Sequence, residues 1–396
     1  MKTWTKMLCA AALALLLPTL PTLVDTAALA AELKVGSTMD LSGPTSSVGQ
    51  PYAKGIRDCV AWLNANGGVA GNTITLVEVD DAYNVQQGMA AYKRFVAQEK
   101  VVAVQGFGTA IVEALVKFAA KDQIPFFSAS YSAHLADPAS APYNFFIAAD
   151  YSTQLRAALK YFKDQWKEAR APKLAFTYPD APYGLVPIAA GKQFAKELGF
   201  EVVGDETVDL KAIDATTQLL SLQKKAPDYT WIGGTTPSAA VMMKDAQKVG
   251  VKTTFFTNIW GSDENIFKLA GPAAEGGYSL QAAAVYGQDV PGMKVIQEVT
   301  KGEPQMTHYV RGFTSMLVLA EGIKKAAAKG KVDGQSIKEA LETLRDFDPM
   351  GLTPAISYFP DDHRPSMAVF LYKMTGGKLV FAAKQELPRD KAWLGK

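Results

Sequence analysis

The feature that most constrains this chain is a regular alternation, from residue 32 onward, of short apolar runs with longer amphipathic stretches. The runs LKVGSTMDL, TITLVEVDD, VVAVQG and IPFFSAS have the apolar and β-branched character of strands. Between them lie YAKGIRDCVAWLNANGG, VQQGMAAYKRFVAQEK and TAIVEALVKFAAKD, whose apolar residues repeat at helical spacing. Strands separated by helices predict βαβ units, and therefore an α/β fold with a mostly parallel sheet flanked by helices on both faces.

A second series with the same rhythm begins after Asp150. Its strand-like runs are KLAFTYPD, EVVGDETVDL, YTWIGGT and TTFFTNIW. GGYSLQAAAVYG is predicted to be an exposed or crossing strand, and AVFLYKMTGGKLVFAAKQEL a late hairpin that turns at Gly376-Gly377. No low-complexity linker separates the two series. We therefore expect two lobes joined by several short crossings, with a ligand cleft between them at the carboxyl ends of the strands.

Residues 1–31 are predicted to be a cleaved signal peptide. Lys2 and Lys6 precede an apolar stretch, and Ala28 and Ala30 form the small-residue pattern that signal peptidase reads. An N-terminal membrane anchor is the alternative, but prolines interrupt the apolar stretch and no basic cluster follows it. Cleavage would leave Cys59 as the only cysteine, so the exported protein would have no intramolecular disulfide.

The charge of the chain is nearly balanced. Its 41 basic and 39 acidic side chains give a net charge of +2, which argues against nucleic acid as a partner. No stretch after residue 31 is long and apolar enough to cross a bilayer. The sequence therefore predicts a soluble, exported protein whose length suits two domains.

The stretch QGFGTAIVEA, residues 105–114, places two glycines between a predicted strand and a predicted helix. A dinucleotide fingerprint requires a third glycine where this chain has Ile111, and no phosphate-binding P-loop motif occurs, so we predict no cofactor. One interpretation is that Gly106 and Gly108 only allow a tight turn. The other is that the helix start and the Thr109 hydroxyl bind a carboxylate. The polar strand end at residues 128–132 would lie beside it, which favours the second interpretation.

Several motifs, taken in order, resemble those of periplasmic substrate-binding proteins of branched-chain amino acid ABC transporters. The resemblance covers essentially the whole chain after residue 31 and rests on these matches: LSGP at 41–44, NANGG at 64–68, Gly71, Asp80-Asp81, IPFFSAS at 124–130, PDAPYG at 179–184 and ALETLRDFDPMGLT at 340–353. The family implies a type I binding-protein fold with two α/β lobes and three inter-lobe crossings. It also implies that residues 32–150 and 281–367 form the N-terminal lobe, and residues 151–280 and 368–396 the C-terminal lobe.

The resemblance also implies a ligand site. A ligand carboxylate would be held at the positions of Thr109, Ser130 and Ser132. Val48 would face the ligand side chain from the first lobe, and Tyr183 and Thr235 would contact it from the second. Many relatives pair the ligand ammonium with a glutamate after the strand TTFFT, but this chain has Asn258, Ile259 and Trp260 there. Either Asp263 or Glu264 replaces that glutamate, or the ligand has no α-amino group, because a buried ammonium without a partner costs several kcal/mol.

Aromatic residues gather at positions expected to face the cleft. An aromatic or branched carboxylic acid would pack against them, although any of them could instead be an ordinary core residue. The full set of predicted ligand-binding residues is Val48, Phe107, Gly108, Thr109, Ser130, Tyr131, Ser132, Tyr183, Thr235, Asn258 and Trp260, and Tyr151 is a further aromatic expected at the cleft.

No pattern in the chain indicates an enzyme. The three histidines are far apart, and neither H-E-x-x-H, C-x-x-C nor G-x-S-x-G occurs, so we predict no metal site and no hydrolase nucleophile. Asp80-Asp81 and the Asp361–Arg364 turn are interpreted as structural. We expect a monomeric periplasmic protein that captures an amino acid or another small carboxylate by hinge closure and delivers it to an ABC permease. The alternative is a free-standing ligand sensor of the same fold.

Overall fold

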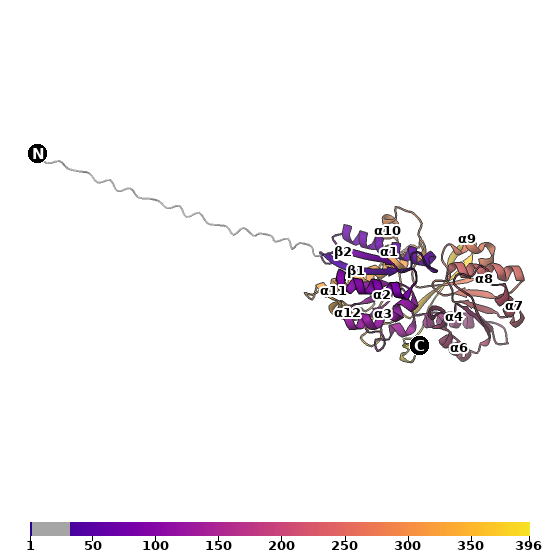
Figure 1. The fold of residues 1–396 in the computed structure, drawn as a ribbon. Coiled ribbons are helices and arrows are strands. Elements are labelled where there is room, and N and C mark those ends of the chain that lie inside the picture. Colours follow the sequence, from indigo (N-terminus) through magenta and orange to yellow (C-terminus); the bar gives the residue numbers. More distant parts are fainter. Residues whose placement is uncertain (2–31) are drawn as a thin grey trace. The chain divides into compact units, whose positions relative to one another are not determined.

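The structure is a computed structural model that describes Met1 and residues 32–396 (Figure 1). Within these residues, the first lobe is built on a parallel sheet of five strands in the order β2-β1-β3-β4-β5. The predicted signal peptide, apart from Met1, lies outside the described residues. The strands are β1 (Glu32–Met39), β2 (Thr73–Asp80), β3 (Ala103–Gly106), β4 (Phe126–Ser128) and β5 (Asn144–Phe145). β3 and β4 are buried along their whole length, as expected for central strands covered on both faces.

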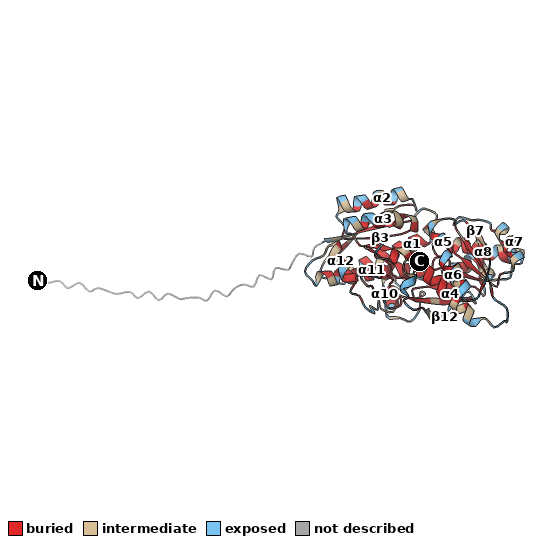
Figure 2. Cartoon of the chain, turned by 90° about the horizontal axis from the view of Figure 1, so that it is seen from below, coloured by how far each residue is buried: buried red, intermediate tan, exposed pale blue. Residues whose placement is uncertain are grey.

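Six helices cover this sheet. They are α1 (Ser46–Ala65), α2 (Val85–Arg94), α3 (Thr109–Asp122), α10 (Pro291–Val299), α11 (Thr307–Ala327) and α12 (Gly334–Leu341). α2 continues into a π-helical turn at Phe95–Glu99. Figure 2 shows exposed residues on the outer side of α2 and α3, whereas α11 is buried through most of its length.

Two glycines bring α1 and α11 into close contact. A Cβ atom on Gly312 would lie 1.9 Å from the carbonyl oxygen of Tyr52, and one on Gly55 would lie 2.1 Å from that of Tyr309. Any larger residue would force the helices apart, because the nearest atoms belong to backbone. This close approach places Tyr52 of α1 beside the residues of α11 on either side of Gly312.

The second lobe contains a seven-stranded sheet in the order β12-β11-β10-β9-β8-β6-β7. The strands are β6 (Lys173–Tyr178), β7 (Glu201–Thr207), β8 (Tyr229–Ile232), β9 (Thr254–Thr257), β10 (Tyr278–Gln281), β11 (Ala368–Thr375) and β12 (Lys378–Glu386). The helices are α4 (Tyr151–Gln165), α5 (Pro182–Leu185), α6 (Ile188–Glu197), α7 (Thr216–Lys225), α8 (Thr236–Val249) and α9 (Ile266–Ala270).

The last strands differ from the rest in direction. β10 runs parallel to β9 but pairs antiparallel with β11, and β11 pairs antiparallel with β12. The predicted hairpin is confirmed, and its turn residues Gly376 and Gly377 have φ values of 58° and 72°, as a two-residue type I′ turn requires. The segment GGYSLQAAAVYG, predicted to be an exposed or crossing strand, contains β10, after which the chain crosses to the first lobe. β10 is mostly buried and pairs with a strand on each side.

The chain passes between the two sheets three times. It leaves the first sheet after β5, returns after β10 to form α10, α11 and α12, and crosses again before β11. The predicted fold class, two mostly parallel α/β lobes with three crossings, is confirmed. A hydrophobic core centred on the first sheet also takes in Tyr183, Ile259 and Trp260, which follow strands of the second sheet. The two lobes therefore share packed side chains where the strands end.

No helix in residues 32–396 combines the length and apolar character needed to span a bilayer.

Candidate ligand-binding site

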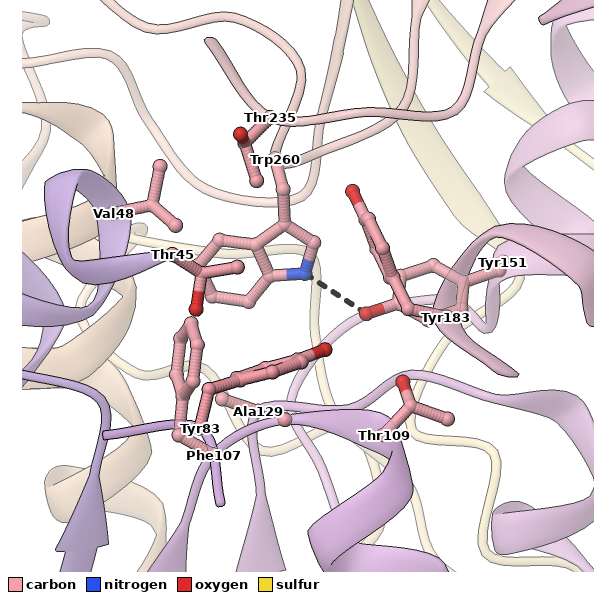
Figure 3. Close-up of a pocket in the computed structure, with 11 residues that line it drawn as sticks. Thr45, Val48, Tyr83, Phe107, Thr109, Ala129, Tyr151, Tyr183, Thr235 and Trp260 are labelled. Atoms are coloured by element: carbon pink, nitrogen blue, oxygen red, sulfur yellow. Dashed lines mark hydrogen bonds between the residues drawn. The ribbon is translucent and has the colours of Figure 1, made fainter. Parts of the chain in front are cut away.

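A cavity lies between the two lobes, at the carboxyl ends of strands from both sheets (Figure 3). Its cavity volume is about 20 Å³, enough for about one water molecule and far below the roughly 300–1,000 Å³ of typical ligand pockets. Its lining residues are Thr45, Val48, Tyr83, Phe107, Gly108, Thr109, Ala129, Tyr151, Tyr183, Thr235 and Trp260. Five of these are aromatic, so the walls are largely apolar and the polar groups are mostly hydroxyls.

The N-terminus of α3 forms one wall of the cavity. Gly108 caps the helix with a φ of 85°, and Thr109 is its first helical residue. The first amides of a helix have no acceptor inside the helix and carry its positive dipole end. The Thr109 and Ser130 hydroxyls lie 2.8 Å apart, and those of Ser130 and Ser132 lie 3.2 Å apart, all within a buried chain of hydrogen bonds. This wall is suited to bind an anion.

The second lobe supplies the opposite wall. The Tyr183 hydroxyl donates to the Gly234 carbonyl at 2.8 Å and accepts from Asn258 Nδ2 at 2.7 Å, which fixes the ring beside the cavity. Thr235 is the N-cap of α8, where its buried side chain forms a capping box with Ser238, and within residues 32–396 its hydroxyl has no further partner. Figure 3 shows it at the cavity beside Trp260, where it can also bond to a ligand.

Trp260 connects the two lobes. It follows β9, yet its indole lies 5.2 Å from the Phe107 ring and 5.8 Å from the Tyr52 ring of the first lobe, centroid to centroid. It is stacked with Tyr131 at 5.7 Å, and its Nε1 donates to the Tyr151 hydroxyl at 2.9 Å. The backbone N–H of Trp260 donates to Asn258 Oδ1 at 2.8 Å, so Asn258 positions both Trp260 and Tyr183.

Neither acid near Trp260 points into the cavity. Asp263 accepts hydrogen bonds from the Thr236 hydroxyl and lies 2.9 Å from His308 Nε2. Glu264 accepts from both the backbone N–H and the hydroxyl of Thr307, and so caps α11. Burial alone would raise the pKa of Asp263, but its hydrogen bonds and the nearby His308 outweigh burial and lower it. Within residues 32–396, no aspartate or glutamate lines the cavity.

Other aspartates shape the loops that carry Thr45 and Tyr83. Asp40 accepts from the Thr45 backbone N–H at 2.7 Å, and Asp81 accepts from the Tyr83 backbone N–H at 2.8 Å and the Thr38 hydroxyl at 2.6 Å. Burial raises the pKa of Asp81 to about 6. These contacts support the structural interpretation of Asp80-Asp81.

The Asp361–Arg364 turn is likewise engaged within the fold. Asp362 forms a buried ion pair with Arg364 at 2.6 Å, and His363 Nε2 lies 3.0 Å from Glu342. In the part of the chain that the structure describes, no group of histidine, cysteine, aspartate and glutamate side chains is arranged to hold a metal ion.

The structure brings the predicted site residues together in two layers. The cavity wall contains Val48, Phe107, Gly108, Thr109, Tyr183, Thr235 and Trp260. Ser130, Tyr131 and Asn258 do not line it but bond to or stack on residues that do, and Ser132 bonds to Ser130. The wall also contains Thr45, Tyr83 and Ala129, which sequence reasoning did not single out. All three follow ends of first-lobe strands, the position that placed Thr109, so the same signal could have found them.

This fold and this site define a two-lobed solute-binding protein. The family model of the periplasmic binding proteins matches residues 32–378, and the chain belongs to that family. Leu/Ile/Val-binding protein homolog 7 of Brucella suis is 25% identical over 356 residues, which cover 81% of this chain and 84% of the relative.

Solved structures agree with this assignment. An ABC transporter substrate-binding protein of Aeropyrum pernix is 31% identical, with a TM-score of 0.86 over 92% of this chain and 98% of the other. A branched-chain amino acid ABC transporter protein of Thermus thermophilus with bound valine is 22% identical, with a TM-score of 0.86 over 91% and 97% of the two chains. A fatty acid ABC transporter substrate-binding protein of Thermomonospora curvata is 20% identical, with a TM-score of 0.81 over 92% and 94%. The family is one of transport proteins that bind solutes, not of enzymes.

Proposed function

We propose that this protein is the solute-binding component of an ABC importer for a small carboxylic acid that has an apolar body and no α-amino group. One observation carries the proposal: the cavity joins the N-terminus of α3 and the Thr109 hydroxyl to aromatic walls, and no described acid lines it. The amides and hydroxyl would bind the carboxylate, the aromatic rings would pack on the body of the ligand, and the Thr235 hydroxyl would bond to it from the second lobe.

The lack of an acidic side chain in the cavity wall formed by residues 32–396 argues against an amino acid. An α-ammonium buried here would lose its water and meet only hydroxyls and aromatic rings, which costs several kcal/mol. The two acids near the site, Asp263 and Glu264, are committed to Thr236, Thr307 and His308. The structural relatives include one described with bound valine and one described as a fatty acid transporter protein, so the fold occurs in proteins named for ligands of both kinds.

Binding would act by closing the two lobes. Residues 32–150 with 281–367 would move as one body, and residues 151–280 with 368–396 as the other. A ligand that touches both walls stabilises only the closed state, and an ABC permease would recognise that state. We propose that the protein does so as a monomer in the periplasm, after removal of residues 1–31. The names of its relatives describe transport proteins, which favours this role over a free-standing sensor.

Pairs of ligands that differ only in the amine test the proposal. 4-Methylpentanoate has the branched body and carboxylate of leucine without the ammonium, and 3-phenylpropanoate stands in the same relation to phenylalanine. We expect calorimetry to show binding of the acids, with the amino acids at least about a hundredfold weaker. Amino acids that bind as tightly as their deaminated partners would contradict the proposal.

The Thr109→Val variant tests where the carboxylate binds. Valine keeps the shape of threonine and removes its hydroxyl, so we expect the affinity for the bound acid to fall about tenfold or more. Ser128→Ala is the matched control, because the Ser128 hydroxyl donates to the Ser130 carbonyl at 2.9 Å and does not line the cavity. Equal affinities in the Thr109→Val variant and the wild type would place the carboxylate elsewhere.

A further inference from the structure

A cluster of buried polar groups surrounds Trp260, and none of its members lines the cavity. It consists of Tyr52 on α1, Tyr131 after β4, and His308 and Arg311 on α11. The Arg311 guanidinium stacks on the Trp260 indole at 3.9 Å from the ring centroid, and Tyr131 is stacked with the same indole. All four residues are fully buried, and the function proposed above uses none of them directly.

Arg311 has only one polar partner. Its Nη2 meets His308 Nδ1, and His308 Nε2 lies 2.9 Å from Asp263. Burial, followed by the charge of Arg311, lowers the pKa of His308 to about 4, so the imidazole is neutral at pH 7. A neutral ring that accepts from Arg311 at Nδ1 carries its proton on Nε2, which faces the Asp263 carboxylate. Arg311 therefore approaches a carboxylate only through an imidazole, and within residues 32–396 its Nε and Nη1 have no hydrogen-bond partner.

The two tyrosines add further donors without acceptors. The hydroxyls of Tyr52 and Tyr131 are buried and face each other, but within residues 32–396 neither meets the geometry of a full hydrogen bond. Tyr131 also faces Arg311, and Tyr52 faces Ser315, whose hydroxyl donates to Gln105 at 2.8 Å. Buried donors in folded proteins are nearly always paired, and each one left unpaired costs about 1–3 kcal/mol. Four such groups at one place indicate that an acceptor belongs there.

Trp260 separates this cluster from the cavity. Its indole lines the cavity and also contacts Arg311, so one side chain stands between the two spaces. Trp260 follows β9 of the second lobe, whereas the four cluster residues belong to first-lobe elements. Separation of the lobes would therefore uncover the cluster, and a rotation of the indole would join the cluster to the cavity.

We propose that Tyr52, Tyr131 and Arg311 form a second subsite, which takes a distal carboxylate of a dicarboxylic acid once the Trp260 indole moves off the guanidinium. An ionised carboxylate is the matching group because it accepts hydrogen bonds at two oxygens and brings no donor of its own. Charge-assisted bonds from an arginine to a carboxylate are among the strongest in proteins. This inference rests on the proposed function for the first carboxylate, which would bind at Thr109. The competing occupant of the cluster is ordered water.

Acids that differ by one carboxylate test the subsite. Hexanoate is compared with hexanedioate, and benzoate with benzene-1,4-dicarboxylate, by calorimetry on the wild type. We expect at least one dicarboxylate to bind about tenfold or more tighter than its monocarboxylate partner. In the Tyr52→Phe/Tyr131→Phe double variant and in Arg311→Met, that ratio should fall to about one. Tyr309→Phe, on the same helix as Arg311, is the control. The Tyr309 hydroxyl donates to Asp58 of α1 at 2.8 Å, so this variant should keep the wild-type ratio.

The outcomes separate the two proposals. If monocarboxylates bind and no dicarboxylate is preferred, or if the preference survives in both variants, the cluster holds water only and the inference is wrong. If dicarboxylates bind in an Arg311-dependent way while Thr109→Val has no effect, the second subsite stands and the proposed position of the first carboxylate fails. Should Arg311→Met not fold, the double tyrosine variant decides alone, since each phenylalanine keeps the ring and removes only an unpaired hydroxyl.

Discussion

The ring of Tyr83 lies over the α-carbon of Gly108, so closely that a Cβ atom on Gly108 would come within 2.6 Å of Tyr83 Cε2. Both residues line the cavity, and Gly108 has a φ of 85°, where side chains are rarely tolerated. Both the cap of α3 and the position of the Tyr83 ring in the cavity wall thus require a glycine at position 108.

Gly108→Ala should therefore harm both stability and binding. We expect the positive φ to cost about 1 kcal/mol and the overlap with Tyr83 roughly another 1–3 kcal/mol, and the displaced ring to weaken ligand binding. Gly287→Ala is the matched control, because Gly287 has a φ of 87° with no atom within 4 Å of the added Cβ. Urea unfolding and calorimetry check both variants. Equal losses of stability in the two would show that Tyr83 exerts no constraint.

Local patterns were sufficient to predict the elements and one wall of the site. Helical and strand periodicity gave most strands and helices of both lobes but not β5, α9 or α10, and the turn at Gly376-Gly377 follows from glycine chemistry. The position of Thr109 follows because the carboxyl ends of parallel strands meet at one edge. These features depend on neighbours in sequence or on the general geometry of parallel sheets.

Contacts between distant segments could not be predicted in the same way. Glu264 caps a helix that begins 43 residues later, so its spacing from β9 says nothing about the direction of its carboxylate. Tyr52 reaches Arg311 only because Gly55 and Gly312 allow two helices to touch. The insertion of Trp260 into the first lobe depends on how the lobes meet, and one sequence contains no signal for that.

Asp81 should make the protein less stable as the pH rises. Its folded pKa of about 6 lies above the ordinary aspartate pKa of 3.8, so between these values the folded state holds a proton that the unfolded state has lost. Stability therefore falls as pH rises from about 4 to 6, by roughly 2–3 kcal/mol from this group. Asp81→Asn retains an acceptor for the Tyr83 N–H and should remove this component. Unfolding curves of both proteins between pH 4 and 7 check it, and parallel pH profiles would rule it out.

His308 should act in the opposite direction. Its folded pKa of about 4 lies below the ordinary histidine pKa of 6.5, so in this range the unfolded state binds the extra proton. Stability should therefore fall as the pH drops from about 6.5 to 4, by roughly 2–3 kcal/mol from this group. His308→Gln cannot take up the proton and should lose that part of the pH dependence, whatever its stability at pH 7. If the slope between pH 4 and 6.5 is unchanged in the variant, the imidazole is not held neutral by its surroundings.

Thr235 allows stability and binding to be separated in a single substitution. It is the N-cap of α8, where its side chain faces the backbone N–H of Ser238 in a capping box. Thr235→Val keeps the shape of the side chain, and we expect it to lower the free energy of unfolding by about 1 kcal/mol in the absence of ligand, because the start of the helix loses its capping oxygen.

The same variant should bind ligand more weakly, by about fivefold to tenfold, because the proposed bond from the second lobe is lost. Thr236→Val is the control, because the Thr236 hydroxyl donates to Asp263 at 2.9 Å and its loss should lower stability without changing the affinity for ligand. Urea unfolding without ligand and calorimetry with it give the two quantities. A Thr235→Val variant that keeps full affinity would show that the ligand leaves this hydroxyl unused, whereas unchanged stability would show that the capping box does not stabilise α8.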